Sequence, residues 1–194
     1  MKISKEQSTI NRRALIDSAS RLYCERGVEG VGLAEIAREA GFTHGGFYGR
    51  FDSKEALAAE ACTASFSTIL ERMRHQLREQ EGGLSPYLTH YFSTTHRDTP
   101  GTGCPMAALA VDAGRNQGLL GDAMSEGIGT YLQELALRRP DGSTSNAIGE
   151  EDKCRAIHSL AVMVGGMVLA RACANSAPAL SDEILATALR VLTT

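Results

Sequence analysis

The part of the sequence that most constrains the fold is the segment from Leu33 to Lys54, LAEIAREAGFTHGGFYGRFDSK. Its first eight residues place apolar side chains at the first, fourth, fifth and eighth positions, which is the spacing of one face of an amphipathic helix. Gly41 follows directly, and a glycine in this place is typical of the left-handed residue that ends a helix. We therefore expect a short helix that stops at Gly41.

A second short helix is expected directly after this turn. Thr43 is suited to cap its N-terminus, and Phe47 and Phe51 lie one turn apart on its buried side. The small side chain of Ala37, four residues before the turn glycine, lets the two helices cross closely. Two short helices joined in this way predict a helix-turn-helix, in which the second helix enters the major groove of DNA.

A wider pattern surrounds this turn. It comprises Arg12 to Gly27, Glu35 to Gly41 and Thr43 to Leu57, the last with the ending aromatic-Tyr-x-x-Phe-x-Ser-Lys-Glu. Together these segments resemble the DNA-binding domain of the TetR/AcrR family of bacterial transcriptional regulators, over about a quarter of the chain. Two positions depart from the family pattern. Gly32 stands where the family usually has Ser or Thr, and Arg50 stands where it frequently has His.

The resemblance implies which residues contact DNA. Thr43, Tyr48 and Lys54 fall where the family binds phosphates, and their hydroxyl and ammonium groups suit that role. His44, Gly45 and Gly46 fall where family members meet base edges. Tyr48 has an alternative as a core aromatic, but the adjacent Phe47 already supplies the ring that faces the core, so we favour the DNA contact. The residues expected to contact DNA are Thr43, His44, Gly45, Gly46, Tyr48, Arg50 and Lys54.

The glycines of the second helix need an explanation. Gly45, Gly46 and Gly49 each cost about 1 kcal/mol relative to alanine in a helix interior. Either the packing of the phenylalanines compensates for a poor helix, or the missing side chains let the backbone lie close to the groove. The second explanation leaves His44 and Arg50 as the main residues that distinguish base sequence.

The rest of the chain also has helical periodicity, without the alternation typical of strands. We expect an all-α protein with about nine helices. The resemblance implies a three-helix DNA-binding domain of the helix-turn-helix type, residues 1–52, and a helical effector-binding and dimerisation domain, residues 53–194. The expected helices span residues 8–26, 33–40, 43–51, 53–80, 85–96, 104 onward, 119–138, 150–174 and 181–192.

Composition and charge exclude several classes of protein. No apolar run approaches the roughly 18 residues needed to span a membrane, and no apolar stretch follows the charges of the N-terminus, so we expect a cytoplasmic protein without a membrane partner. The five cysteines are odd in number and lack C-x-x-C spacing, which argues against a disulfide framework and a structural zinc site. We expect no metal and no cofactor. The net charge of −3 is unusual for a DNA-binding protein, but its distribution matters more than its sum.

A stripe of small residues runs along the expected helix at 150–174. Small side chains on one face let two helices approach closely, either within one subunit or between two subunits. The resemblance implies the second case, a homodimer with a four-helix bundle across its two-fold axis. Two recognition helices would then lie about one DNA turn apart over a palindromic operator. The stripe consists of Val162, Gly166, Ala170 and Ala174.

The resemblance also implies a pocket for a small-molecule effector in the C-terminal part. Large apolar and aromatic side chains are available there, although such residues also form ordinary cores. His90, His96 and His158 are too scattered in the sequence to indicate a metal site, and we expect them at the surface or hydrogen-bonded within the fold. The candidate pocket residues are Phe66, Met73, Tyr91, Met106 and Met163.

Cys104 is a candidate sensor thiol. It stands at the start of an expected helix, in GCPMAAL, where unpaired backbone N–H groups favour a thiolate. The segment resembles the Gly-Cys-x-Met/Leu stretch of TetR-type repressors that sense electrophiles and oxidants. The alternative is an inert residue at a helix start. We expect the other four cysteines, Cys24, Cys62, Cys154 and Cys173, to be buried and inert.

These observations predict a dimeric DNA-binding regulator, a repressor released from a palindromic operator by a small-molecule effector. Oxidation or alkylation of Cys104 is an alternative trigger. A cysteine-dependent enzyme with His90 or His96 as base is a weaker alternative, because no third residue that would orient the base is identifiable. An architectural DNA-binding protein would need little beyond the first 60 residues, so the long remainder argues against it.

Overall fold

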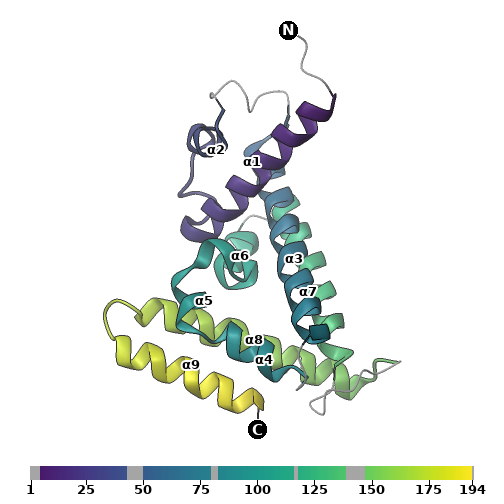
Figure 1. Ribbon diagram of the computed structural model, residues 1–194, viewed down its shortest axis with the longest axis vertical. Coiled ribbons are helices and arrows are strands. Elements are labelled where there is room, and N and C mark those ends of the chain that lie inside the picture. Colours follow the sequence, from purple (N-terminus) through teal and green to yellow (C-terminus); the bar gives the residue numbers. More distant parts are fainter. Residues whose placement is uncertain (1–4, 43–49, 80–82, 116–117, 139–146, 194) are drawn as a thin grey trace. The chain divides into compact units, whose positions relative to one another are not determined.

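The computed structural model describes residues 5–42, 50–79, 83–115, 118–138 and 147–193, and the structural statements below concern these residues (Figure 1). Within them the chain forms nine α-helices and one short 3-10 helix, with no β-strand, and the predicted all-α fold is confirmed. The elements are α1 (Lys5–Arg26), α2 (Leu33–Glu39), α3 (Lys54–Glu79), α4 (Ser85–Tyr91), α5 (Thr94–Asp98), η2 (Pro100–Thr102), α6 (Pro105–Arg115), α7 (Leu119–Ala136), α8 (Glu150–Cys173) and α9 (Pro178–Thr193).

The segment expected as one helix over residues 85–96 is instead two helices, α4 and α5. Ser93 separates them, because its hydroxyl donates to the carbonyl of His90 at 2.8 Å and accepts from the backbone N–H of His96 at 3.1 Å. This serine is therefore the N-cap of α5. The apolar periodicity continues through the break, which is why the pattern alone predicted a single helix.

The first turn of α3 is fixed by two side chains. The hydroxyl of Ser53 accepts from the backbone N–H of Ala56 at 3.0 Å and caps the helix. The carboxylate of Glu55 accepts from the backbone N–H of Leu119 at 2.8 Å, so α3 also caps the start of α7. A side chain at Gly118 would place its Cβ 2.2 Å from that carboxylate, so the contact requires glycine there.

The chain divides into two compact units, each described here by itself. Unit 1 consists of residues 1–67 and 100–125, and unit 2 of residues 68–99 and 126–194, so the division falls within α3 and α7. Unit 1 thus contains more than the 52 residues expected to form the DNA-binding domain. The functional boundary at residue 52 stays a prediction.

The core of unit 1 lies where α1 meets α2, the first half of α3 and α6. Leu15, Tyr23, Ile36 and Leu57 are fully buried there. The hydroxyl of Ser20 donates to the carbonyl of Ala61 at 2.9 Å and joins α1 to α3. This core holds α1 and α2 in a fixed relation to the start of α3.

Unit 2 is built around α8, which packs along α9 (Figure 1). Met163, Met167 and Ala170 of α8 are completely buried. The hydroxyl of Ser181 joins the two helices by donating to the carbonyl of Ala170 at 2.7 Å. In the same unit the hydroxyl groups of Tyr87 on α4 and Tyr131 on α7 form a buried hydrogen bond.

Among the described helices, α8 is long and apolar enough to cross a membrane by length and composition alone. The core helix of a globular domain passes the same test. One stripe of α8 is buried against the rest of unit 2, while Ile157, Val168 and Leu169 are exposed on its other faces.

A buried histidine gives the stability of unit 2 a pH dependence. His96 is 7% exposed, and its Nδ1 lies 2.6 Å from the carbonyl oxygen of Tyr91. Burial lowers the pKa of His96 to about 4, and neighbouring cations add to the effect. A histidine in an unfolded chain has a pKa of about 6.5, so below that pH the unfolded state binds a proton that the folded state does not. The free energy of unfolding should therefore fall by about 2 kcal/mol between about pH 6.5 and about pH 5.

Chemical denaturation of the native chain and of His96→Gln at several pH values tests this prediction. We expect the native chain to lose stability through this window and the variant to show a flatter profile. Equal slopes for the two proteins would assign the pH dependence to other groups.

Candidate nucleic-acid interface

Most of the residues expected to contact DNA lie outside the described ranges. Arg50 and Lys54 are described, and both are half-buried. We call the expected second helix, residues 43–51, the recognition segment. The structure describes the helices on either side of this segment and only its last two residues. The predicted contacts outside the described residues are Thr43, His44, Gly45, Gly46 and Tyr48.

The first helix of the predicted helix-turn-helix is α2, and its C-terminus has the expected geometry. Gly41 has a φ of 79°, which few residues other than glycine adopt. Its backbone N–H donates to the carbonyl of Arg38 at 3.0 Å, and that of Phe42 donates to Ala37 at 2.8 Å. This pair of bonds is a Schellman motif, so the helix ends where the sequence predicted.

The N-terminus of α2 shows the effect of the departure from the family pattern. Gly32 is the N-cap and has no side chain to bond the first turn. Its carbonyl accepts from the N–H groups of Glu35 and Ile36 at 3.1 and 3.2 Å. Serine or threonine in this place would add a side-chain cap and a hydroxyl at the helix N-terminus.

Ion pairs join the outer surfaces of α1 and α2. The guanidinium of Arg21 binds both Glu25 on its own helix and Glu39 on α2. The guanidinium of Arg26 lies 3.0 Å from Glu35 of α2. Exposed pairs of this kind contribute up to about 1 kcal/mol each, so the buried residues between the two helices dominate their association.

The chain re-enters the described structure at Arg50 and Phe51. The ring of Phe51 is buried, and the guanidinium of Arg12 lies 4.6 Å above its centroid while also binding Glu60 of α3. Arg12 therefore holds the end of the recognition segment between α1 and α3. The sequence analysis did not predict this role of Arg12. The available signal was its position on α1 three residues before the buried Leu15, which places Arg12 at the edge of the buried face of that helix.

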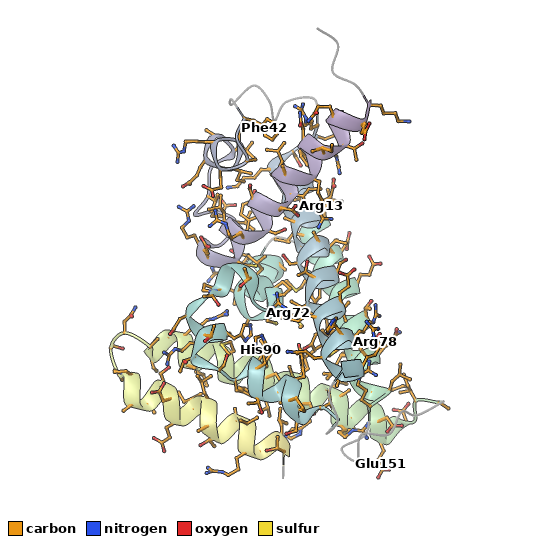
Figure 2. The ribbon with its side chains drawn as sticks, in the orientation of Figure 1. Arg13, Phe42, Arg72, Arg78, His90 and Glu151 are labelled. Atoms are coloured by element: carbon orange, nitrogen blue, oxygen red, sulfur yellow. The ribbon has the colours of Figure 1, made fainter. Side chains whose placement is uncertain are left out.

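Arg50 is partly committed to the fold. Its guanidinium lies 5.9 Å from the ring centroid of Phe42, the residue that precedes the recognition segment in the sequence. Figure 2 labels Phe42 just after α2. Lys54 is the first residue of α3, where the N–H groups of a helix N-terminus favour an anion such as a phosphate. Both cations border the segment expected to enter the groove.

Residues 15–61 match the family model described as bacterial regulatory proteins, tetR family. This N-terminal segment is therefore similar to the DNA-binding domain of the TetR family. The HTH-type transcriptional repressor DhaR of Mycobacterium sp. (strain GP1) is 26% identical over 101 residues, which cover 52% of this chain and 51% of that protein. The HTH-type transcriptional regulator AcrR of Shigella flexneri is 37% identical over 68 residues, 35% of this chain and 32% of AcrR. The chain thus spans about half or less of the length of these curated relatives.

The likeness of fold extends over nearly the whole chain. The crystal structure of the reduced form of E. coli NemR superposes with a TM-score of 0.72 at 22% identity, covering 94% of each chain. At this identity the match shows the TetR fold alone. The predicted helical fold of the described residues is therefore the fold of these regulators.

The stripe of small residues on α8 is positioned mainly by packing within the subunit. A Cβ added at Gly166 would lie 3.0 Å from Ala188 of α9 and 3.2 Å from the ring of Phe92. Ala170 is completely buried. Val162 and Ala174 are half-buried. Gly166 and Ala170 thus pack inside one subunit, and Gly166 also lines the groove between α8 and α9. Their place in a subunit interface stays a prediction.

Larger apolar side chains occupy the outer face of the same two helices. Leu169 and Val168 on α8 are 58% and 43% exposed, and Leu180 and Val191 on α9 are 48% and 51% exposed. A shallow groove of about 540 Å³ runs between the helices. We call this surface the α8–α9 groove; its lining includes Ala161, Val162, Gly165, Leu169, Leu180, Ile184 and Val191.

The candidate pocket residues are all buried, which both the pocket and the ordinary-core alternatives require. Phe66 and Met106 belong to unit 1, and Met73, Tyr91 and Met163 belong to unit 2. The pocket stays a prediction.

The cysteines differ from one another in exposure. Cys104 directly precedes α6, as expected, but its side chain is buried. Cys24 and Cys62 are buried, and burial raises the pKa of the Cys62 thiol to about 12. The expectation that Cys154 is buried was wrong, because it lies on an outer face of α8 and is exposed, while Cys173 is intermediate.

Proposed function

We propose that this chain is a homodimeric TetR-family transcriptional repressor that binds a palindromic DNA operator and is released by a small-molecule effector. The observation that carries the proposal is the helix-turn-helix frame within residues 15–61: α2 ends at the Gly41 turn, and Phe51 anchors the return of the chain. The relatives reported above are named as transcriptional regulators or repressors. A cysteine-dependent enzyme is therefore not proposed.

The proposed dimer uses the α8–α9 groove. Its exposed leucine and valine side chains form a contiguous apolar surface on two adjacent helices, which favours burial against a second copy. Two-fold pairing would present two recognition segments to successive major-groove faces of one DNA duplex. A regulator of this kind acts in the cytoplasm, without a membrane partner.

Two variants test the DNA contacts against each other. Lys54→Ala should weaken binding to all sequences by a similar factor and lower the salt slope of log K by about one, because it removes one phosphate contact. His44→Ala should relax base preference at one or two positions of each half-site. Fluorescence anisotropy with DNA selected from a random pool, compared with unrelated DNA over a range of salt, measures both effects.

The outcome that contradicts the assignment is specific to each variant. Equal losses on selected and unrelated DNA for His44→Ala would remove it as a base contact. An unchanged salt slope for Lys54→Ala would remove it as a phosphate contact.

Modification of Cys104 is a second candidate trigger. The thiol directly precedes α6, where the helix N-terminus favours the thiolate. Since the side chain is buried, modification would require a local movement that exposes the thiol. Peroxide or N-ethylmaleimide should then release DNA from the native chain and not from Cys104→Ser. Cys154→Ser, at an exposed thiol, is the matched control.

A further inference from the structure

Four basic side chains from four helices of unit 2 lie close together. They are Arg72 on α3, His90 on α4, His96 on α5 and Arg171 on α8, and we call them the histidine–arginine cluster. The rings of His90 and His96 stack with centroids 6.2 Å apart and planes 19° apart. Figure 2 labels Arg72 and His90, which lie near each other in that view, and the effect of Arg72 on the pKa of His90 agrees with this proximity.

The surroundings of the cluster are electropositive. Burial lowers the pKa of His96 most, and the charged groups that lower it further are Arg171, His90 and Arg72. Burial lowers the pKa of His90, and the charge of Arg72 lowers it further. The charged groups that act on these rings, among the described residues, are therefore all cations. Each of them disfavours a protonated imidazole.

Two acidic side chains of unit 2 form ion pairs with one arginine next to His96. Arg97 binds Asp98 of its own helix at 2.7 Å and Asp182 of α9 at 2.8 Å. The guanidinium of Arg171 is held by backbone carbonyls, donating to His96 at 3.0 Å and to Arg97 at 3.1 Å. These bonds orient Arg171. The pKa of Asp98 is lowered mainly by its hydrogen bond to Arg97, and the charge of Arg171 lowers it further.

The cluster is reachable and has an aromatic neighbour. His90 is exposed and Arg72 is half-buried, while His96 lies behind them. The ring of Tyr91 meets that of His96 edge-on with centroids 4.7 Å apart. Tyr87 continues the aromatic line along α4, with its ring centroid 6.4 Å from that of Tyr91. Because Tyr91 and Tyr87 are themselves buried, the reachable part of the cluster is basic, and it suits the negative group of a ligand.

A second polar atom points to a ligand. Gln76 lies four residues after Arg72 on α3, so the two side chains share a face of the helix. Its Oε1 is buried and accepts no hydrogen bond from any residue that the structure describes. A buried amide oxygen without a donor costs free energy that a ligand hydroxyl or N–H would recover.

We propose that Arg72, His90 and His96 bind the acidic group of the effector, which is therefore an organic anion such as a carboxylate or a phosphate ester; this inference rests on the effector-dependent function proposed above. The anion pairs with Arg72 and favours the protonated form of the two imidazoles. Binding is then coupled to proton uptake, and the affinity rises as the pH falls.

Histidine Cε1 signals in ¹H–¹³C spectra of the full chain test the proposal, with benzoate and phenyl phosphate as anionic probes and benzamide as a neutral isostere. We expect saturable shifts of the His90 and His96 signals with an anion and none with benzamide. Arg72→Gln should weaken anion binding about tenfold, since one charge-assisted contact is lost. Arg72→Lys should retain most of it, and Arg78→Gln, on the same helix, should leave it unchanged.

Three results overturn the proposal: benzamide binding as tightly as benzoate, no shift of either histidine with both anions at millimolar concentration, or unchanged affinity in a folded Arg72→Gln. Anisotropy with selected DNA separates this inference from the proposed function. If an anion binds but the DNA stays bound, the anion site exists but is not the effector site. If the protein binds DNA and no anion binds, the proposed function stands and the anion site does not exist.

Discussion

We expect the Leu169→Glu variant to be a monomer that has lost most of its affinity for operator DNA. Leu169 is 58% exposed and lines the α8–α9 groove. In the proposed dimer this side chain is buried against a second copy, and an unpaired carboxylate there costs several kcal/mol. Since each subunit contacts half of a palindrome, loss of the dimer should lower DNA affinity at least about a hundredfold.

Light scattering after size exclusion gives the mass, and anisotropy gives the affinity. Val111→Glu is the matched control, because Val111 on α6 is 63% exposed and lies outside the groove. It should change neither the mass nor the DNA affinity. A native chain that is already monomeric at micromolar concentration, or a dimeric Leu169→Glu, would contradict the proposed interface.

The second large effect is expected at Phe51. Phe51→Ala should lower the free energy of unfolding by about 4 kcal/mol, because it removes a buried ring from the junction of α1 and α3. It also removes the surface on which the guanidinium of Arg12 rests. The end of the recognition segment is then no longer fixed, so specific DNA binding should be lost even where the protein remains folded.

Two measurements separate stability from positioning at this site. Chemical denaturation gives the loss of stability, and anisotropy well below the denaturation midpoint gives the loss of DNA affinity. Phe51→Leu keeps apolar volume but removes the ring under Arg12, so we expect a loss of about 1 kcal/mol and a weaker effect on binding. Native DNA affinity in a folded Phe51→Ala would show that this anchor does not position the recognition segment.

Local signals predicted α2 and its end correctly. Apolar spacing and the turn glycine act within one helical turn, so the sequence contains the information directly, and Gly41 has the expected positive φ. The break between α4 and α5 is also local, since Ser93 caps the second helix. It was missed because apolar periodicity runs through it, and a single serine is a weaker signal than that pattern.

The face of α8 that turns inward could not be predicted in the same way. Its small residues and its large apolar residues both recur at helical spacing, so the pattern alone does not show which face turns inward. The structure places Gly166 and Ala170 against α9 and the core, and leaves Leu169 exposed. Where α9 crosses closely, only small side chains fit, and the larger ones are therefore on the outer face.

The sequence by itself determined the all-helical class, the helix α2 with its turn glycine, and the match of residues 15–61 to a known family, because periodicity, turn residues and a specific motif are properties of neighbouring residues. Only the tertiary structure decided that Arg12 holds Phe51, that His96 is buried, and that basic residues of α3, α4, α5 and α8 meet. These contacts join residues tens of positions apart, and their energies depend on distance and burial, which no local pattern specifies.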